Sequence, residues 1–270
     1  MGEAARSTEH MCYCVGIKIY GDGSQYVGEF KHGKRHGEGS LTTSDGYVYS
    51  GSWAEDRREG RGRSTWKDGS IYVGEFLNDR RHGEGKYVHA SEENSYQYTG
   101  SWLLDKPHGM GTESYEDGSV YTGNWEEGRY HGEGTFTSGG GSRSDSPGYR
   151  YEGSWVSGLA AGRGKATYPD GTVYEGHWLD DKYHGEGVLS MLNGYRYSGL
   201  WEANLRQGQG SCVYQDNSSY EGLYHQDKRH GQGSFRSADG SFTFTGEWVN
   251  DEPRAGTSST VKDDQGASAL

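Results

Sequence analysis

Polar and apolar residues alternate along this chain in short stretches that favour β-strands. Tyr26, Gly28 and Phe30 share one side of such a stretch, and alternation of period two is typical of a strand. After about five polar or charged residues, Gly37 to Thr43 forms a second such stretch, and Asp45-Gly46 follows it. Asp-Gly pairs tolerate positive φ and are a strong hairpin signal. The pattern predicts a β-hairpin and then a turn into the next hairpin.

This hairpin pattern recurs along almost the whole chain. The element Tyr-x-Gly-x-aromatic returns after 23 residues in six of nine intervals, and intervals of 26, 30 and 24 residues mark insertions. A fixed period of this length indicates a repeat array. We predict that the aromatic rings of this element form the core of the array. They are Tyr26, Phe30, Tyr49, Trp53, Tyr72, Phe76, Tyr98, Trp102, Tyr121, Trp125, Tyr151, Trp155, Tyr174, Trp178, Tyr197, Trp201, Tyr220, Tyr224, Phe244 and Trp248.

The repeats predict an all-β fold, an elongated single-layer antiparallel meander of tandem β-hairpins. We expect the array over residues 14–256, with a half repeat at Val15 to Gly23, nine repeats from Tyr26 and a partial last repeat from Phe244. Residues 1–13 and 257–270 are expected to be flexible tails, and 138–148 a flexible insertion. Unpaired strands at the two ends of such a sheet favour self-association.

Composition changes this picture little. Only 30% of residues are hydrophobic and 47 are glycine, which alone would favour disorder, but an aromatic content of 13% favours packing. Cys12, Cys14 and Cys212 are too few for a disulfide framework, and no stretch has 18 consecutive apolar residues. These features favour a soluble, intracellular protein. The net charge of −12 argues against binding nucleic acid or anionic lipid through bulk charge.

One repeat carries a family resemblance in full. Tyr151-Glu152-Gly153-Ser154-Trp155, followed by Gly162-Arg163-Gly164, Tyr168 and Asp170-Gly171, resembles the membrane occupation and recognition nexus (MORN) repeat at every position that defines it. The element Arg/Tyr-His-Gly-Glu/Gln-Gly is most similar to the repeats of radial spoke head proteins. It occurs at 35–39, 81–85, 130–134, 183–187 and 229–233.

This resemblance implies a non-catalytic scaffold in a ciliary or flagellar axoneme, located in the cytoplasm and cytoskeleton, that binds other cytoskeletal or axonemal proteins. Two alternatives remain open: a peripheral membrane scaffold that binds phosphoinositides, and a regulatory array for a separate kinase or methyltransferase. No Ser, Cys or Asp stands apart from the repeat with a partner at a distinctive spacing. We therefore expect no catalytic residue, no nucleotide site and no cofactor.

Six histidines precede a Gly-x-Gly element, and we expect them in turns along one edge of the sheet. A row of histidines could bind metal or sense pH; the alternative is a turn residue that caps its neighbour. No repeat supplies a second His or Cys nearby, and Cys12-x-Cys14 has no matching pair, so no metal site is predicted. The histidines are His36, His82, His108, His131, His184 and His230.

The turns on the same edge also carry cations. Lys31, Lys34 and Arg35 give the first turn a charge of +3, whereas acidic residues offset the cations of later turns. An anionic membrane attracts several uncompensated cations, which only the first turn offers. We expect this turn to dock an acidic partner; the alternative is a solvated edge.

Overall fold

The computed structural model describes residues 13–91, 94–139, 148–254 and 259–261, and its regular elements there are β-strands, with no helix. The strands are β1 (Tyr13–Ile19), β2 (Gln25–Lys31), β3 (Lys34–Thr42), β4 (Val48–Ala54), β5 (Arg57–Thr65), β6 (Ile71–Leu77), β7 (Arg80–His89), β8 (Tyr96–Leu103), β9 (Lys106–Tyr115), β10 (Val120–Glu126), β11 (Arg129–Thr137), β12 (Arg150–Val156), β13 (Leu159–Thr167), β14 (Val173–Leu179), β15 (Lys182–Ser190), β16 (Arg196–Glu202), β17 (Leu205–Val213), β18 (Ser219–His225), β19 (Lys228–Arg236), β20 (Phe242–Val249), β21 (Glu252–Pro253) and β22 (Ser259–Val261).

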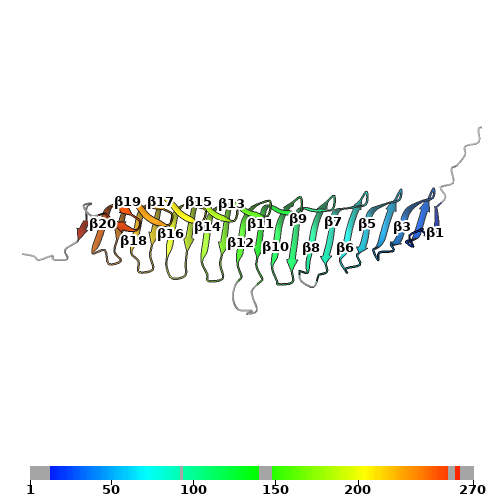
Figure 1. The fold of residues 1–270 in the computed structure, drawn as a ribbon, viewed down its shortest axis with the longest axis horizontal. Helices are drawn as coiled ribbons and strands as arrows, with labels where there is room; N and C mark the ends of the chain where they lie inside the picture. The colour runs from blue at the N-terminus through cyan, green and yellow to red at the C-terminus, as the bar shows by residue number, and fades with distance from the viewer. Residues whose placement is uncertain (1–12, 92–93, 140–147, 255–258, 262–270) are drawn as a thin grey trace, which may run out of the picture. The chain divides into compact units, whose positions relative to one another are not determined.

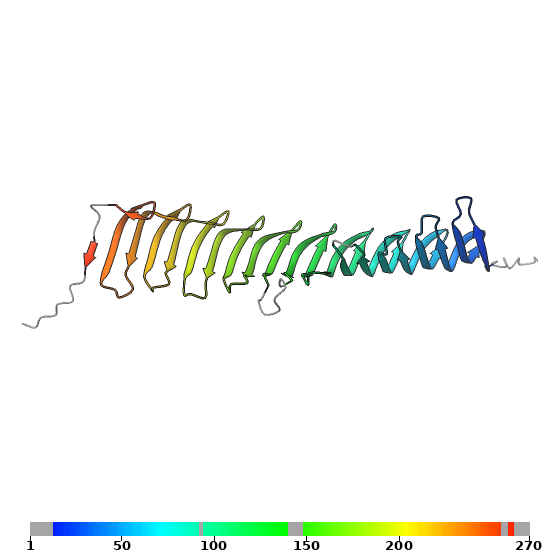
Figure 2. The ribbon, with the colours of Figure 1, turned by 60° about the horizontal axis from the view of Figure 1, so that its bottom comes forward.

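The chain forms two compact units. Unit 1 comprises Met1–Glu116 and Asn124–Arg129, and unit 2 comprises Asp117–Gly123 and Tyr130–Leu270. In unit 1, β1 to β9 pair antiparallel in chain order. In unit 2, β11 to β20 do the same. Figures 1 and 2 show the strands of each unit side by side in a single layer. The predicted all-β antiparallel meander is confirmed.

A pair of facing glycines lies in the middle of the strand pairs. Gly28 on β2 faces Gly39 on β3, and Gly39 also faces Gly51 on β4. Within a hairpin the second strand bulges beside this pair, because β3 places the residues from His36 to Glu38 opposite Glu29 alone. The His-Gly-Glu element is therefore a β-bulge, which adds residues to one strand of a pair.

The second strand of each hairpin begins earlier than predicted. The expected start of the first one was Gly37, but β3 begins at Lys34 because the preceding turn takes only two residues. For the same reason the six predicted turn histidines lie in strands, in β3, β7, β9, β11, β15 and β19.

Two-residue turns close the hairpins at one edge of the sheet, which we call the tight-turn edge. Both residues of each turn have positive φ, the type I′ geometry that matches strand twist. The turns are His32-Gly33, Glu55-Asp56, Asn78-Asp79, Leu104-Asp105, Glu127-Gly128, Ser157-Gly158, Asp180-Asp181, Ala203-Asn204, Gln226-Asp227 and Asn250-Asp251.

The Asp-Gly pairs lie at the opposite edge, in longer turns that join one hairpin to the next. In the turn after β3, Gly46 N–H donates to the Thr43 carbonyl at 3.0 Å and Thr43 N–H donates to the Tyr47 carbonyl at 2.9 Å. Gly46 has a φ of 91°, whereas Asp45 has no positive φ. The Asp-Gly pairs turn the chain where expected, but the two-residue turns lie at the opposite, tight-turn edge.

The tyrosine and tryptophan rings of the repeat share one face of the sheet, which we call the aromatic face. Nineteen of the twenty rings predicted as the core are buried, and Phe30 is half-buried. Trp53 lies between Tyr49 of its own repeat and Tyr26 of the preceding one, with ring centroids 5.0 and 5.4 Å apart and planes nearly perpendicular. Phe30 has Tyr26 on one side, and on the other β1 aligns Cys14 with it.

Each core tyrosine ring covers the glycine pair. Tyr26 Oη donates to the Glu29 carbonyl at 3.0 Å, and a Cβ added to Gly39 would lie 2.1 Å from that hydroxyl oxygen. The indole Nε1 of Trp53 donates to the Gly39 carbonyl at 3.1 Å. The missing glycine side chain thus makes room for the ring, and the ring satisfies its own polar atom on the backbone.

The ends of the array differ from each other. At one end β1, the expected half repeat, pairs with β2 in a register that sets Gly16 opposite Gly28. At the other end β20 pairs with both β21 and β22. Part of the expected C-terminal tail, Ser259–Val261, therefore forms a strand instead. Residues 1–12, 255–258 and 262–270 of the expected tails, and 140–147 of the expected insertion, lie outside the described residues.

Candidate protein-binding surface

Arginines on the second strands bind the tight turn of the following hairpin. Arg81 on β7 stacks its guanidinium on the Trp102 ring, 4.3 Å from the ring centroid. Its Nε donates to Asp105 Oδ1 at 3.4 Å, and its terminal nitrogen donates to the Asp105 carbonyl at 2.8 Å. The same arrangement joins four further pairs: Arg35 with Asp56, Arg58 with Asp79, Arg206 with Asp227, and Arg229 with Asp251.

Backbone hydrogen bonds run along the same edge. From the second tight turn onward, the second residue of each turn donates its N–H to the carbonyl of the second residue after the preceding turn, as Asp105 does to the Arg81 carbonyl at 2.9 Å. Such bonds continue where the arginine is absent, for example from Gly128 to the Pro107 carbonyl at 3.0 Å. We call these turn-to-turn contacts the ladder. In the ladder, charged residues that the sequence suggested for docking instead bind neighbouring hairpins to each other.

The expected docking edge is part of this ladder. Lys34 Nζ lies 2.5 Å from Glu55 Oε2, and Arg35 Nε lies 3.3 Å from Asp56 Oδ1. The hydrogen bond and charge of Glu55 raise the pKa of Lys34. Two of the three cations counted at the first turn thus have acidic neighbours from the second turn. Docking of an acidic partner by Lys31, Lys34 and Arg35 stays a prediction.

A second row of rings lies on the aromatic face beside the Asp-Gly turns. These rings follow the Gly-x-Gly element or precede the core tyrosine, and they are only half-buried. In unit 2, Tyr195 and Tyr214 have ring centroids 6.3 Å apart, and Tyr214 and Phe235 are 6.5 Å apart. The row gives the aromatic face a set of rings that a second molecule can reach.

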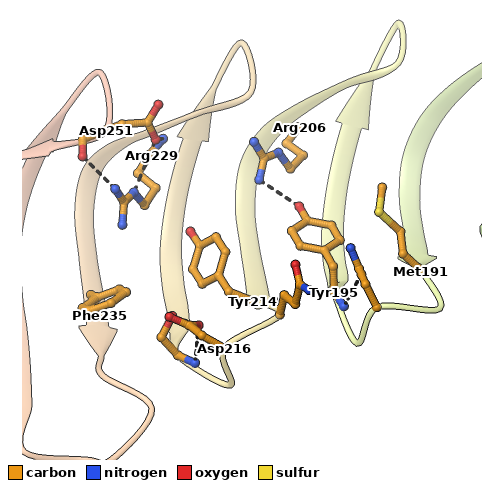
Figure 3. A pocket seen from close by; sticks show the side chains of 11 residues that line it. Met191, Tyr195, Arg206, Tyr214, Asp216, Arg229, Phe235 and Asp251 are labelled. Carbon is orange, nitrogen blue, oxygen red and sulfur yellow. Dashed lines mark hydrogen bonds and ion pairs between the residues drawn. The ribbon is translucent and has the colours of Figure 1, made fainter.

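In unit 2 this second row and two arginines line a groove of about 990 Å³. Figure 3 shows Tyr195, Tyr214 and Phe235 following one another across neighbouring strands, with the Arg206 and Arg229 side chains on one side of them. Arg206 donates to Tyr195 Oη at 3.1 Å. The remaining lining residues are Met191, Asn193, Gln215, Asp216, Ser218 and Asp251.

Unit 1 has a smaller groove of the same chemistry, about 460 Å³ in volume. Tyr47 and Trp66 form its ring row, with centroids 5.8 Å apart, and Arg58 donates to the Tyr47 hydroxyl. The other residues that line it are Arg35, Leu41, Trp53, Phe76, Asp79, Arg81 and Asp105. The two grooves occur where neighbouring repeats carry the arginine; in other repeats Pro107, Tyr130, Ala160 or Tyr183 takes its place.

The electrostatics of the unit 2 groove are balanced. Arg206 and Arg229 contribute two positive charges, and Asp216 and Asp251 contribute two negative ones. Asp216 accepts from the Ser218 hydroxyl at 2.6 Å and from its N–H at 2.9 Å, and these bonds lower the pKa of the carboxyl. Burial raises the pKa of the Tyr195 and Tyr214 hydroxyls, which keeps them neutral donors.

The histidines do not assemble into a site within the described residues. The structure groups no three His, Cys, Asp or Glu side chains there in a way that could hold a metal ion. The Nδ1 atoms of His82, His108 and His230 are buried without a hydrogen-bond partner. Cys14 is exposed and Cys212 is buried, and both are free thiols.

The grooves were not foreseen from the sequence, although a signal for them was present. Each arginine of the ladder is the second residue after a tight turn and precedes its aspartate by 21 to 24 residues. The rings of the second row recur either two or four residues beyond the Gly-x-Gly element or two residues before the core tyrosine. The described residues include no helix long and apolar enough to cross a bilayer.

Comparison with known families gives one clear match. The MORN repeat model matches residues 26–46, 49–71, 72–92, 98–120, 121–143, 151–173, 174–194, 197–219 and 220–242. These nine segments begin at the nine core tyrosines from Tyr26 to Tyr220. No curated protein sequence matches the chain significantly.

Several solved structures share local likeness at low overall similarity. The SAS-4 (dCPAP) TCP domain in complex with a proline-rich motif of Ana2 (dSTIL) of Drosophila melanogaster is 12% identical, with a TM-score of 0.29, covering 83% of this chain and 97% of that chain. A mutant TCP10 domain of Danio rerio CPAP is 12% identical, with a TM-score of 0.27, covering 86% and 99%. At these TM-scores neither likeness carries an inference about function.

Proposed function

Since the chain belongs to the MORN repeat family, we propose that it is a non-catalytic scaffold of a ciliary or flagellar axonemal assembly, similar in role to a radial spoke head component. Its partners are other cytoskeletal and axonemal proteins, which it binds through the grooves of the aromatic face. The axonemal assignment is supported by the recurring His-Gly-Glu/Gln-Gly element, which is most similar to that of radial spoke head repeats.

The observation that carries binding of a protein partner is the composition of the grooves. Tyr, Trp and Arg are the residue types most enriched at the centres of protein interfaces. These residues and their acidic partners make up eight of the ten lining residues of the unit 1 groove and five of the eleven of the unit 2 groove, which also has Phe235. The rings offer apolar surface, while Tyr hydroxyls and Arg N–H groups offer donors to the carbonyls of an extended segment.

The same composition favours a protein over a phosphoinositide headgroup. A multiply phosphorylated headgroup requires uncompensated cations. Two arginines and two aspartates line the unit 2 groove, and in the ladder each arginine is already bonded to the aspartate of the next turn. Salt-sensitive binding of the chain to phosphoinositide liposomes would contradict this part of the proposal.

The test is proximity labelling from a tagged copy in its native cell, combined with imaging of the tag. We expect the wild type to label axonemal proteins along a cilium, and the Tyr214→Ala/Phe235→Ala variant to lose at least part of that set. Val213→Ala is the matched control, because Val213 is exposed beside Tyr214 in sequence but on the opposite face. Labelling of plasma-membrane proteins, or co-purification of a kinase or methyltransferase as the main partner, would overturn the proposal.

A further inference from the structure

The outermost strand of unit 1 exposes an unusual row of apolar side chains. Val15, Ile17 and Ile19 on β1 are 80%, 66% and 73% exposed. They point to one face, opposite to the aromatic face, because their neighbours Cys14, Gly16 and Lys18 are the residues aligned with Phe30, Gly28 and Tyr26. We call this set the β1 patch.

No other strand of the same type carries such a patch. The strands equivalent to β1 are the second strands of the nine hairpins, aligned on their central glycine. At the positions of Val15, Ile17 and Ile19 they have Glu38/Ser40/Thr42, Arg61/Arg63/Thr65, Glu84/Lys86/Val88, Met110/Thr112/Ser114, Glu133/Thr135/Thr137, Arg163/Lys165/Thr167, Glu186/Val188/Ser190, Gln209/Ser211/Val213 and Gln232/Ser234/Arg236. None has more than one apolar residue of the three. The apolar row is therefore specific to the edge strand.

The pairing of the outermost strands also differs between the two ends of the array. Among the described residues, β1 pairs only with β2, whereas the strand at the other end, β20, is paired along both halves by β21 and β22. An exposed edge strand with β-branched apolar residues and one charge is a template for a further strand. The covered β20 edge disfavours a head-to-tail partner there.

We propose that the β1 strands of two copies pair antiparallel about a two-fold axis at Gly16, which makes the chain a homodimer. The register repeats the rule of the array, since Gly16 would face Gly16 of the partner subunit as Gly28 faces Gly39. Val15 would then face Ile17 of the partner subunit, and the six apolar side chains of the two copies would form one patch. Cross-strand pairs of β-branched residues stabilise such a contact.

Charge disfavours one alternative register that also keeps two-fold symmetry, and the glycine pairing of the array favours Gly16 over the others. Lys18 is the only charged residue of β1, and in the Gly16 register it faces Cys14 of the partner subunit. A register centred on Lys18 would set two lysines directly opposite each other, which is destabilising. The inference does not depend on which proteins bind the grooves, because β1 is not part of either one.

The oligomeric state of the full chain tests the dimer. We expect sedimentation analysis to show a reversible dimer, and Ile17→Lys to raise its dissociation constant roughly a hundredfold or more, because two isoleucines lose their burial. Val73→Lys is the matched control, since Val73 is an exposed valine on the same face but inside the array. A monomeric wild type, or equal weakening by both variants, would overturn the proposal.

A disulfide tests the register. In a background of Cys12→Ser and Cys212→Ser, Lys18→Cys should form a cross-linked dimer through the native Cys14 of the partner subunit under mild oxidation. Within one copy the two positions are four residues apart on one strand, about 13 Å, which is too far for a disulfide. Adding Cys14→Ser should abolish the cross-link. Cross-linking that persists without Cys14, or none at all in a wild-type-like dimer, would overturn the Gly16 register.

Discussion

At the scale of the residue, the fold depends on glycines that face each other under a tyrosine ring. Gly28 and Gly39 lie so close that a Cβ on Gly28 would be 2.5 Å from the Gly39 Cα and 2.7 Å from the Glu38 carbonyl oxygen. The ring of Tyr26 then covers the pair and is fully buried. Glycine is weak in an ordinary strand, but here it permits the close approach on which the aromatic core depends.

Gly28→Ala is expected to lower the free energy of unfolding by about 1–3 kcal/mol or more, because the added methyl group meets backbone that cannot move aside. Urea unfolding followed by tryptophan fluorescence measures the change. Gly21→Ala is the control, since nothing lies within 4 Å of its added Cβ, and we expect its effect to stay within about 0.5 kcal/mol. Equal losses in the two variants would contradict this account of the glycine pair.

At the scale of the element, each hairpin is fixed to the next by the ladder of arginines and turns. The guanidinium of Arg81 stacks on the ring of Trp102 and donates hydrogen bonds to the carboxylate and to the carbonyl of Asp105. Its side chain is 22% exposed, so the contacts are partly shielded from solvent. Planar stacking and a forked set of donors are properties of arginine that lysine lacks.

Arg81→Lys is expected to cost about 1–2 kcal/mol of unfolding free energy, because the ammonium group retains charge but loses the stacking and the fork. The neighbouring Arg80→Lys serves as the control and should change stability by less than about 0.5 kcal/mol. A double-mutant cycle with Asp105→Asn should show coupling, because the two side chains share one set of bonds. Additive losses would show that the Arg81–Asp105 contact contributes little.

The sequence allowed the strands, the repeat and the core rings to be predicted, because period-two alternation and the 23-residue spacing are local properties. It did not locate the tight turns. Type I′ turns usually carry Asn-Gly or Asp-Gly, but here one of them is Leu104-Asp105 and the Asp-Gly pairs serve longer turns. The turn that closes the hairpin is determined by the facing glycines and the bulge, which are tertiary features.

The candidate surface was predictable only in part. The basic residues of the turns were recognised, but Lys34 and Arg35 were counted as uncompensated because their own turn has no carboxylate. Their ion-pair partners, Glu55 and Asp56, are 21 residues further on. Only the register between hairpins, which a sequence does not display, brings these groups together. The grooves depend on the same register.

At the scale of the whole molecule, the buried tyrosines link stability to alkaline pH. Burial raises the pKa of Tyr26, Tyr197 and Tyr220 to about 12, and it raises the pKa of the other core tyrosines further still. In the unfolded chain a tyrosine ionises near pH 10. A group whose pKa is raised by folding contributes stability that is present below pH 10 and lost as the pH rises through 12.

We therefore expect the chain to remain folded up to about pH 10 and to unfold cooperatively between about pH 10 and 12. Far-ultraviolet circular dichroism and tyrosinate absorbance, recorded on the same samples, should change together. Independent titration of all tyrosines near pH 10 without loss of β-structure would contradict the prediction.

The turn ladder has a consequence for how such a chain can change in length. Every bond that joins two hairpins ends one repeat further along, so a duplicated 23-residue block inside the array brings its own partners with it. Each added hairpin contributes two strands, or about 9.6 Å along the sheet. Duplication of repeats would therefore change the distance between two binding sites in steps of one hairpin, without redesigning any contact.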